Sequence, residues 1–229
     1  MDKPKIQKGI FRSWEAVNDL GMGETFATPA PLGVVDEFRK LILSDDADYI
    51  AVYLTGLRLS HYNFLLTDYS YFQFSYSNID CVRYAFYPNP FAHNLADFKR
   101  WQELVEAGYL TQEEYLGMLR DARADFRVPI IRYENAPEQH KGLRHPCSHF
   151  HIGHHSDNRW AINRVLTPLA FVLLVIKQYY GSVWREAGDD ETDVFGNILE
   201  ASLVRERANC RLIDEALFTK AEERSFFFS

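Results

Sequence analysis

The sequence predicts an α+β fold in which helices pack on an antiparallel β-sheet of about five strands, with a helical hairpin inserted into the sheet. Three observations lead to this prediction. Aromatic and β-branched residues crowd residues 62–87, as in strands. Apolar residues recur every three or four positions near both ends of the chain, as in amphipathic helices. A helical pattern at residues 95–124 separates the first strands from the later ones.

The first part of the chain, residues 1–58, is predicted to be helical. Apolar residues at three- and four-residue intervals predict an amphipathic helix over residues 6–20, closed by Gly21. Residues 34–43 and 46–57 carry two further helical patterns. A loop containing two prolines is expected between the first and second of these helices.

Residues 59–165 are predicted to form the sheet and its inserted hairpin. The aromatic runs within residues 62–87 indicate a three-stranded antiparallel meander. In the hairpin, Gly108 ends the first helix, and Thr111 with Glu114 forms a capping box that begins the second. Strands are then expected at residues 128–135 and 148–154, and a last one near residues 160–164.

The last part, residues 166–229, is predicted to be helical. Pro168 suits the first turn of a buried helix that runs to Tyr179. The apolar residues Leu199, Leu203, Ile213 and Leu217 suggest helices on the outside of the core. Because no repeat, low-complexity tract or linker interrupts the chain, residues 1–229 are expected to form a single domain.

Charge and composition narrow the classes of partner. A formal net charge of −7 and a pI near 5.6 argue against a wholly basic nucleic-acid-binding surface. They also argue against binding to anionic membranes, which would repel the protein. The longest apolar run, near residues 166–176, is too short to span a bilayer, and the N-terminus lacks a hydrophobic signal core. We therefore expect a cytoplasmic protein with no membrane partner. Its three isolated cysteines are expected to be reduced.

Histidines gather in one short segment. Of the eight histidines, six lie between residues 140 and 155: His140, His145, His149, His151, His154 and His155. If residues 148–154 form a strand, the alternation of side chains places His149 and His151 on one face. On the preceding strand, the same alternation places Arg132 and Glu134 on a common face. A suitable register would therefore bring one arginine, one glutamate and two histidines together.

Such a cluster can transfer protons and stabilise an anion. Histidine titrates near neutral pH, so one imidazole can act as a base and another as an acid, while a guanidinium holds phosphate. The candidate catalytic residues are His149, His151, Arg132, Glu134 and, in an auxiliary role, His145. The candidate substrate-binding residues are Tyr133, Asn135, Arg83 and Gln73, although Tyr133 suits a core aromatic better than a catalytic phenol.

The charge around this segment favours an anionic partner. Residues 127–164 contain six basic and three acidic residues, whereas the whole chain is acidic. A phosphodiester substrate such as RNA would be attracted there, and an acidic protein partner equally so.

Three other interpretations of this histidine-rich segment stay open. They can be structural polar groups inside the fold. They can bind a divalent metal such as zinc, because His145, His149 and His151 have ligand spacing, although no carboxylate ligand follows from spacing alone. Cys147 as a nucleophile is a weaker interpretation, because a neighbour in sequence need not face it in space. Nucleotide-binding, serine-hydrolase and zincin motifs do not occur in the sequence.

Two resemblances rest on specific residues. The segment Arg132-Tyr133-Glu134-Asn135-Ala136-Pro137, followed by His145-Pro146 and by residues 148–153 (SHFHIG), resembles a bacterial family designated a domain of unknown function. A shorter stretch is similar to the TumE-type toxins of toxin–antitoxin pairs, which share an R-Y-D-N-A-P core and a later H-x-H. Here the acidic residue is Glu134, Glu138 and Gln139 replace a histidine pair, and the hairpin is an insertion. The second resemblance implies a growth-inhibiting or defence-associated toxin that cleaves RNA.

Together these observations favour a nuclease-like protein that acts on RNA without a cofactor, because paired acid and base suffice when a ribose 2′-OH is the nucleophile. Two alternatives come from other classes. One is a non-enzymatic interaction subunit that binds a protein encoded nearby. The other is a metal-dependent hydrolase.

Overall fold

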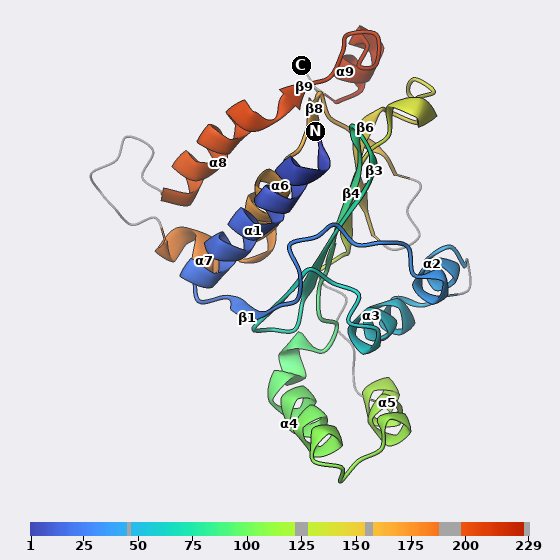
Figure 1. Ribbon diagram of the computed structural model, residues 1–229, viewed down its shortest axis with the longest axis vertical. Helices are drawn as coiled ribbons and strands as arrows, with labels where there is room; N and C mark the ends of the chain where they lie inside the picture. The colour runs from blue at the N-terminus through green and yellow to red at the C-terminus, as the bar shows by residue number, and fades with distance from the viewer. Residues whose placement is uncertain (45–46, 122–127, 154–157, 188–197, 227–229) are drawn as a thin grey trace.

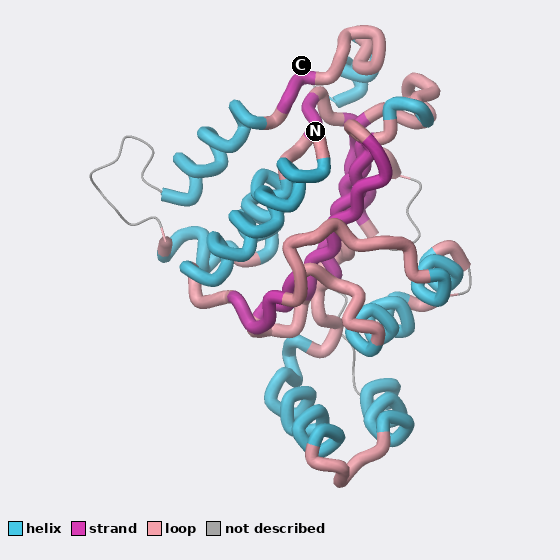
Figure 2. The backbone as a smooth tube through the Cα atoms, in the orientation of Figure 1, coloured by secondary structure: helices cyan, strands magenta, loops and turns pink. Residues whose placement is uncertain are grey.

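A computed structural model of the chain describes residues 1–44, 47–121, 128–153, 158–187 and 198–226. Its centre is an antiparallel sheet in which the described strands follow the order β1-β2-β3-β4-β5-β6-β7, so that each strand pairs with its neighbours in sequence. Figure 2 shows these strands as the magenta centre of the molecule. The strands are β1 (Gly23–Phe26), β2 (Phe64–Leu66), β3 (Tyr71–Asn78), β4 (Cys81–Tyr87), β5 (Ile131–Asn135), β6 (Ser148–Ile152) and β7 (Trp160–Ala161).

Helices cover both faces of this sheet (Figure 1). On one side lie α1 (Lys3–Asp19), α6 (Pro168–Tyr179), α7 (Gly181–Glu186) and α8 (Ile198–Asn209). On the other lie α2 (Asp36–Ile42) and α3 (Tyr49–Arg58), and the hairpin of α4 (Leu95–Glu106) and α5 (Gln112–Asp121) extends from one end. A small second sheet pairs β8 (Arg164–Val165) with β9 (Arg211–Leu212), and α9 (Lys220–Phe226) follows it.

Alternating side chains of the central strands form two separate cores. On β3, Phe72 and Phe74 point into the core shared with α1 and α6, whereas Tyr71 points into the core shared with α3. Burial of such aromatic side chains removes a large apolar area from water, which is the main stabilising contribution to the fold. The core on the α3 side ends near Ala85 and Ile130, so the sheet beyond them carries polar residues on this face.

The α+β class and the main helices agree with expectation. The buried helix predicted from Pro168 to Tyr179 has those bounds as α6, and the Thr167 hydroxyl caps it by accepting a hydrogen bond from Ala170 N. The hairpin has the predicted capping box, because Glu114 N donates to Thr111 Oγ1 and Thr111 N donates to Glu114 Oε2. Gly108, at φ +77°, follows α4 as expected.

The predicted number of strands was too low: the central sheet has seven described strands rather than about five. Strand β1 was missed because four residues after Gly21 carry little periodicity, and it is defined by its pairing with β2. The last predicted strand divides into β7 and β8, which belong to different sheets. Ile213 and Leu217 lie between β9 and α9 rather than in a helix. Among the described residues, no helix is both long and apolar enough to cross a membrane.

Candidate functional site

The register of β5 and β6 brings the predicted cluster together. Arg132 lies opposite His151, and Glu134 lies opposite His149. On the other side of β5, Arg83 of β4 lies opposite Glu134. Since residues directly opposite each other in an antiparallel pair point to the same face, all five side chains emerge on one face of the sheet. At the other end of the sheet, α2 and α3 cover this same face.

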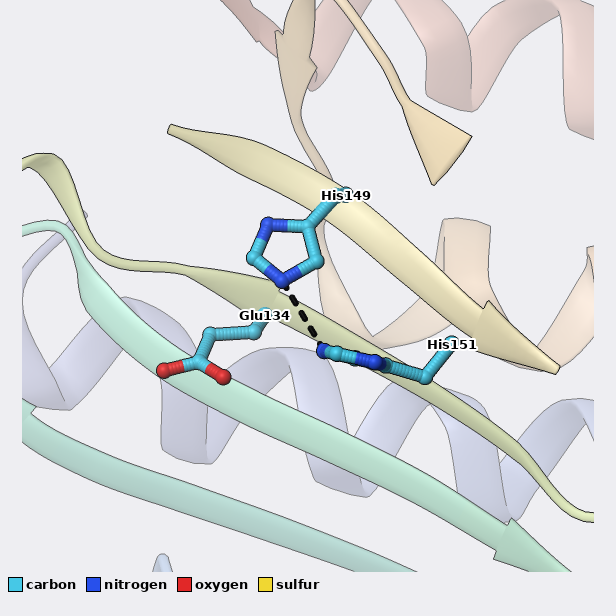
Figure 3. A group of neighbouring side chains, drawn as sticks. All are labelled: Glu134, His149 and His151. Carbon is cyan, nitrogen blue, oxygen red and sulfur yellow. Dashed lines mark hydrogen bonds between the residues drawn. The ribbon is translucent and has the colours of Figure 1, made fainter. Parts of the chain in front are cut away.

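The two histidines contact each other directly. The Nε2 atoms of His149 and His151 lie 2.9 Å apart, and their ring planes meet at 69° (Figure 3). His149 Nδ1 lies 2.8 Å from the carbonyl oxygen of Pro146. Because a carbonyl oxygen can only accept, Nδ1 carries the proton and donates it. The Nε2 lone pair of neutral His149 therefore points toward His151.

Burial keeps His149 neutral. The side chain is fully buried, and this burial, together with the adjacent His151, lowers the pKa of His149 to about 4, against the opposing effect of Glu134. At neutral pH His149 is thus an electron-pair donor with a fixed orientation. This state suits a metal ligand or a base and does not suit a general acid.

Glu134 completes a group of three possible metal ligands. Its carboxylate and the imidazole nitrogens of His149 and His151 all lie within 4.8 Å of one another. Figure 3 shows the carboxylate beside the two rings. Arg83 donates hydrogen bonds from Nε and Nη2 to one oxygen, Oε1, at 3.0 and 2.8 Å. Oε2 is not engaged by Arg83.

These residues match what a divalent ion requires. Two imidazoles and one carboxylate form the ligand set of many catalytic zinc sites, in which further positions stay open for water or substrate. Ligating histidines usually donate their second N–H to a backbone carbonyl, as His149 does to Pro146. The hydrogen bonds from Arg83 orient the carboxylate in the same way.

The ligand set differs from the one that sequence spacing suggested. Glu134 joins His149 and His151 in the group, and His145 does not. The His145 ring packs edge-on against His149 with ring centroids 5.0 Å apart, and burial and Arg159 lower its pKa. Its Nδ1 is a buried atom without a hydrogen-bond partner among the described residues. The alternation of β5 had already placed Glu134 on the correct face, but its nearness to His149 depends on strand pairing.

Three of the four predicted substrate-binding residues lie away from this cluster. Tyr133 is fully buried on the opposite face, where its hydroxyl lies 2.9 Å from Ser148 Oγ. Asn135 is also buried there and donates to the Asp80 carbonyl. Gln73 is buried and donates to the His61 carbonyl. Arg83 is the member of this set that contacts the cluster.

The remaining residues of the histidine segment have other surroundings. His140 Nε2 lies 3.2 Å from Oε1 of the buried Glu222, far along the chain in α9. Burial raises the pKa of the Cys147 thiol to about 11, so at neutral pH it is protonated, unlike an activated nucleophile. His154 and His155 lie outside the described residues.

Residues 33–229 match the model of one protein family, described as uncharacterized conserved protein (DUF2290). The chain belongs to the DUF2290 family. This supports the sequence-based resemblance to a domain of unknown function. In this DUF2290 member, the matched residues include every element from α2 to α9. They therefore include all residues of the cluster. No curated protein and no solved structure matches the chain.

Proposed function

We propose that this protein is a metal-dependent hydrolase that binds a divalent ion, zinc by ligand preference, through Glu134, His149 and His151. The observation that carries the proposal is the convergence of one carboxylate and two imidazoles within 4.8 Å, with His149 held in the tautomer that a ligand needs. An ion in this position would polarise a substrate oxygen and lower the pKa of a bound water.

The geometry favours this function over metal-free acid–base catalysis. A general acid and a general base that act on one phosphodiester must each reach a different oxygen of the reacting group. Here the Nε2 atoms of His149 and His151 are 2.9 Å apart, which leaves no space for a phosphate between them. The pKa of about 4 also leaves His149 without a proton to give at Nε2 near neutral pH. Both features are compatible with two ligands of one ion.

A phosphodiester, with RNA as the first candidate, is the proposed substrate class. Arg132 lies opposite His151, and Arg159 lies close enough to affect the pKa of His145, so two further arginines lie near the cluster. Guanidinium groups bind phosphate oxygens in a bidentate manner. The similarity of the Arg132–Pro137 segment and the H-x-H pair to TumE-type toxins supports the same class, and with it a role in toxin–antitoxin or defence systems.

Metal binding tests the site first. We expect the metal-free protein to bind one Zn²⁺ in a calorimetric titration. Glu134→Gln should weaken this binding at least about tenfold, because the amide loses the charge that holds the ion. Glu138→Gln is the matched control, since Glu138 lies outside the cluster but in the same segment. Equal binding by Glu134→Gln and wild type would refute the proposed ligand set.

Cleavage tests the reaction. Wild-type protein, Glu134→Gln and His151→Asn would be incubated with labelled RNA, single-stranded DNA and duplex DNA, with Zn²⁺ or Mn²⁺ and with EDTA. We expect cleavage only by the wild-type protein, and only when the metal ion is present. Cleavage that survives EDTA would instead support the metal-free nuclease, with His149 and His151 as acid and base. If the wild-type protein neither binds metal nor cleaves any of these substrates, the result would favour the interaction subunit with a protein partner.

A further inference from the structure

A polar pocket lies on the opposite side of the sheet from the cluster. It has a volume of about 410 Å³ and opens between the first turns of α1, the start of α6 and the small sheet that contains β9. In Figure 1 these elements meet near the N-terminus, beside the end of α8. Its charged lining residues are Lys5, Lys8, Arg12, Asp80, Glu206 and Arg211.

The two carboxylates of this pocket are already engaged by the protein. Glu206 is 3% exposed and accepts hydrogen bonds from Thr167 Oγ1 at 2.7 Å, Asn209 Nδ2 at 2.9 Å and Arg12 Nη2 at 3.1 Å. Asp80 Oδ2 lies 2.8 Å from Arg211 Nη2. Glu206 therefore balances the charge of Arg12, whereas Asp80 is shared between Arg211 and the α-ammonium group of Met1.

Two lysines remain without such a counter-charge. Lys5 and Lys8 are exposed, and neither ammonium group forms an ion pair with a described residue. They lie three residues apart on α1, so they project from the same side of the helix about one turn apart. The pocket thus presents more positive than negative charge, although the whole chain carries −7. Such a concave, locally positive surface concentrates anions.

The lining also indicates which part of a ligand would be recognised. None of the described residues that line the pocket is aromatic, so it offers no ring on which a nucleobase could stack. Lysine and arginine side chains suit phosphate oxygens, and the spacing of Lys5 and Lys8 suits adjacent phosphates. We infer that this pocket binds a small ligand through a chain of two or more phosphate groups, independently of the Glu134 cluster.

Calorimetric titration of the metal-free protein with inorganic triphosphate and with ATP tests this inference. We expect saturable binding of both ligands with similar affinity, weakened by added salt as for any partly exposed ion pairing. Lys5→Gln/Lys8→Gln should weaken the binding of both by about tenfold or more. Lys40→Gln/Lys220→Gln is the matched control, because it removes the same charge at exposed positions outside the pocket and should leave affinity unchanged. Unchanged melting temperatures would show that each variant is folded.

Several results would overturn the inference. One is the absence of saturable binding by wild type. Another is an equal loss in the Lys40/Lys220 control, which would show attraction to overall charge alone. ATP affinity far above that of triphosphate would contradict recognition through phosphate. A single-stranded oligonucleotide that binds more tightly than either ligand, and is lost in the Lys5/Lys8 variant, would replace the small ligand by a nucleic acid. None of these results depends on the metal site, so the two proposals fail separately.

Discussion

Arg83 and Glu134 form a two-bond contact across β4 and β5, in which both Nε and Nη2 of the arginine reach the same carboxylate oxygen. The arginine side chain is 66% exposed, so this contact adds little to stability. Its consequence is directional, because two hydrogen bonds to one oxygen fix the orientation of the carboxylate beside the two histidines.

Loss of Arg83 should therefore weaken metal binding without unfolding the protein. For Arg83→Gln we expect zinc affinity to fall about tenfold, as is usual when a residue that orients a ligand is removed. The free energy of unfolding of the metal-free protein should change by less than about 1 kcal/mol. Calorimetry and urea unfolding measure the two quantities. Arg100→Gln, at an exposed position in α4, is the control, and an equal affinity loss there would contradict the role of Arg83.

The low pKa of His149 should make metal-free protein less stable in acid. The unfolded chain takes up a proton near the ordinary histidine pKa of about 6.5, whereas the folded protein resists protonation until its pKa of about 4. The contribution of His149 to the free energy of unfolding is therefore fully present above about pH 7, and it falls as the pH drops from about 6.5 to about 4. We expect a loss of about 3 kcal/mol from this group between pH 7 and pH 4.

Urea unfolding of wild type and His149→Gln across this pH range measures the effect. The variant should be less stable at pH 7, yet its stability should change less on acidification. His93→Gln, at an exposed position, should keep the wild-type slope. Parallel curves for wild type and His149→Gln would show that another group causes the acid sensitivity.

The Tyr133 hydroxyl should matter for stability and not for metal binding. It accepts a hydrogen bond from Leu166 N at 2.9 Å and lies 2.9 Å from Ser148 Oγ, so it joins β5 to β6 and to the segment before α6. Tyr133→Phe leaves a buried N–H without its partner, and we expect a loss of about 1–3 kcal/mol in the free energy of unfolding. Zinc affinity should be unchanged, and a large loss of affinity would assign Tyr133 to the site. Tyr109→Phe, at a side chain that is 80% exposed, is the control.

Close packing of α3 on the sheet can be tested with two glycines. A Cβ at Gly56 would lie 2.0 Å from the Tyr71 hydroxyl oxygen, so Gly56→Ala must displace a buried ring. We expect this variant to lose about 1–3 kcal/mol. A Cβ at Gly117 in α5 meets no atom within 4 Å, so Gly117→Ala should instead stabilise the protein by about 0.5–1 kcal/mol. Thermal unfolding distinguishes the two, and equal effects would contradict the packing of α3.

The sequence by itself determined the local features of this protein. Alternation along two strands placed Arg132 with Glu134 and His149 with His151, because the two-residue period follows from backbone geometry alone. Capping residues and proline located the hairpin and α6 in the same way, since their hydrogen bonds join residues a few positions apart.

Only the tertiary structure decided which of these residues meet. Glu134 rather than His145 joins the histidines because strand pairing sets one register between β5 and β6, and no local spacing encodes that register. The burial that lowers the pKa of His149 is likewise a property of the folded protein and not of its neighbours in sequence alone. Strand β1 and the pocket beside Lys5 and Lys8 also depend on long-range contacts. Side-chain direction is thus a local property of the chain, whereas distance between side chains arises from packing.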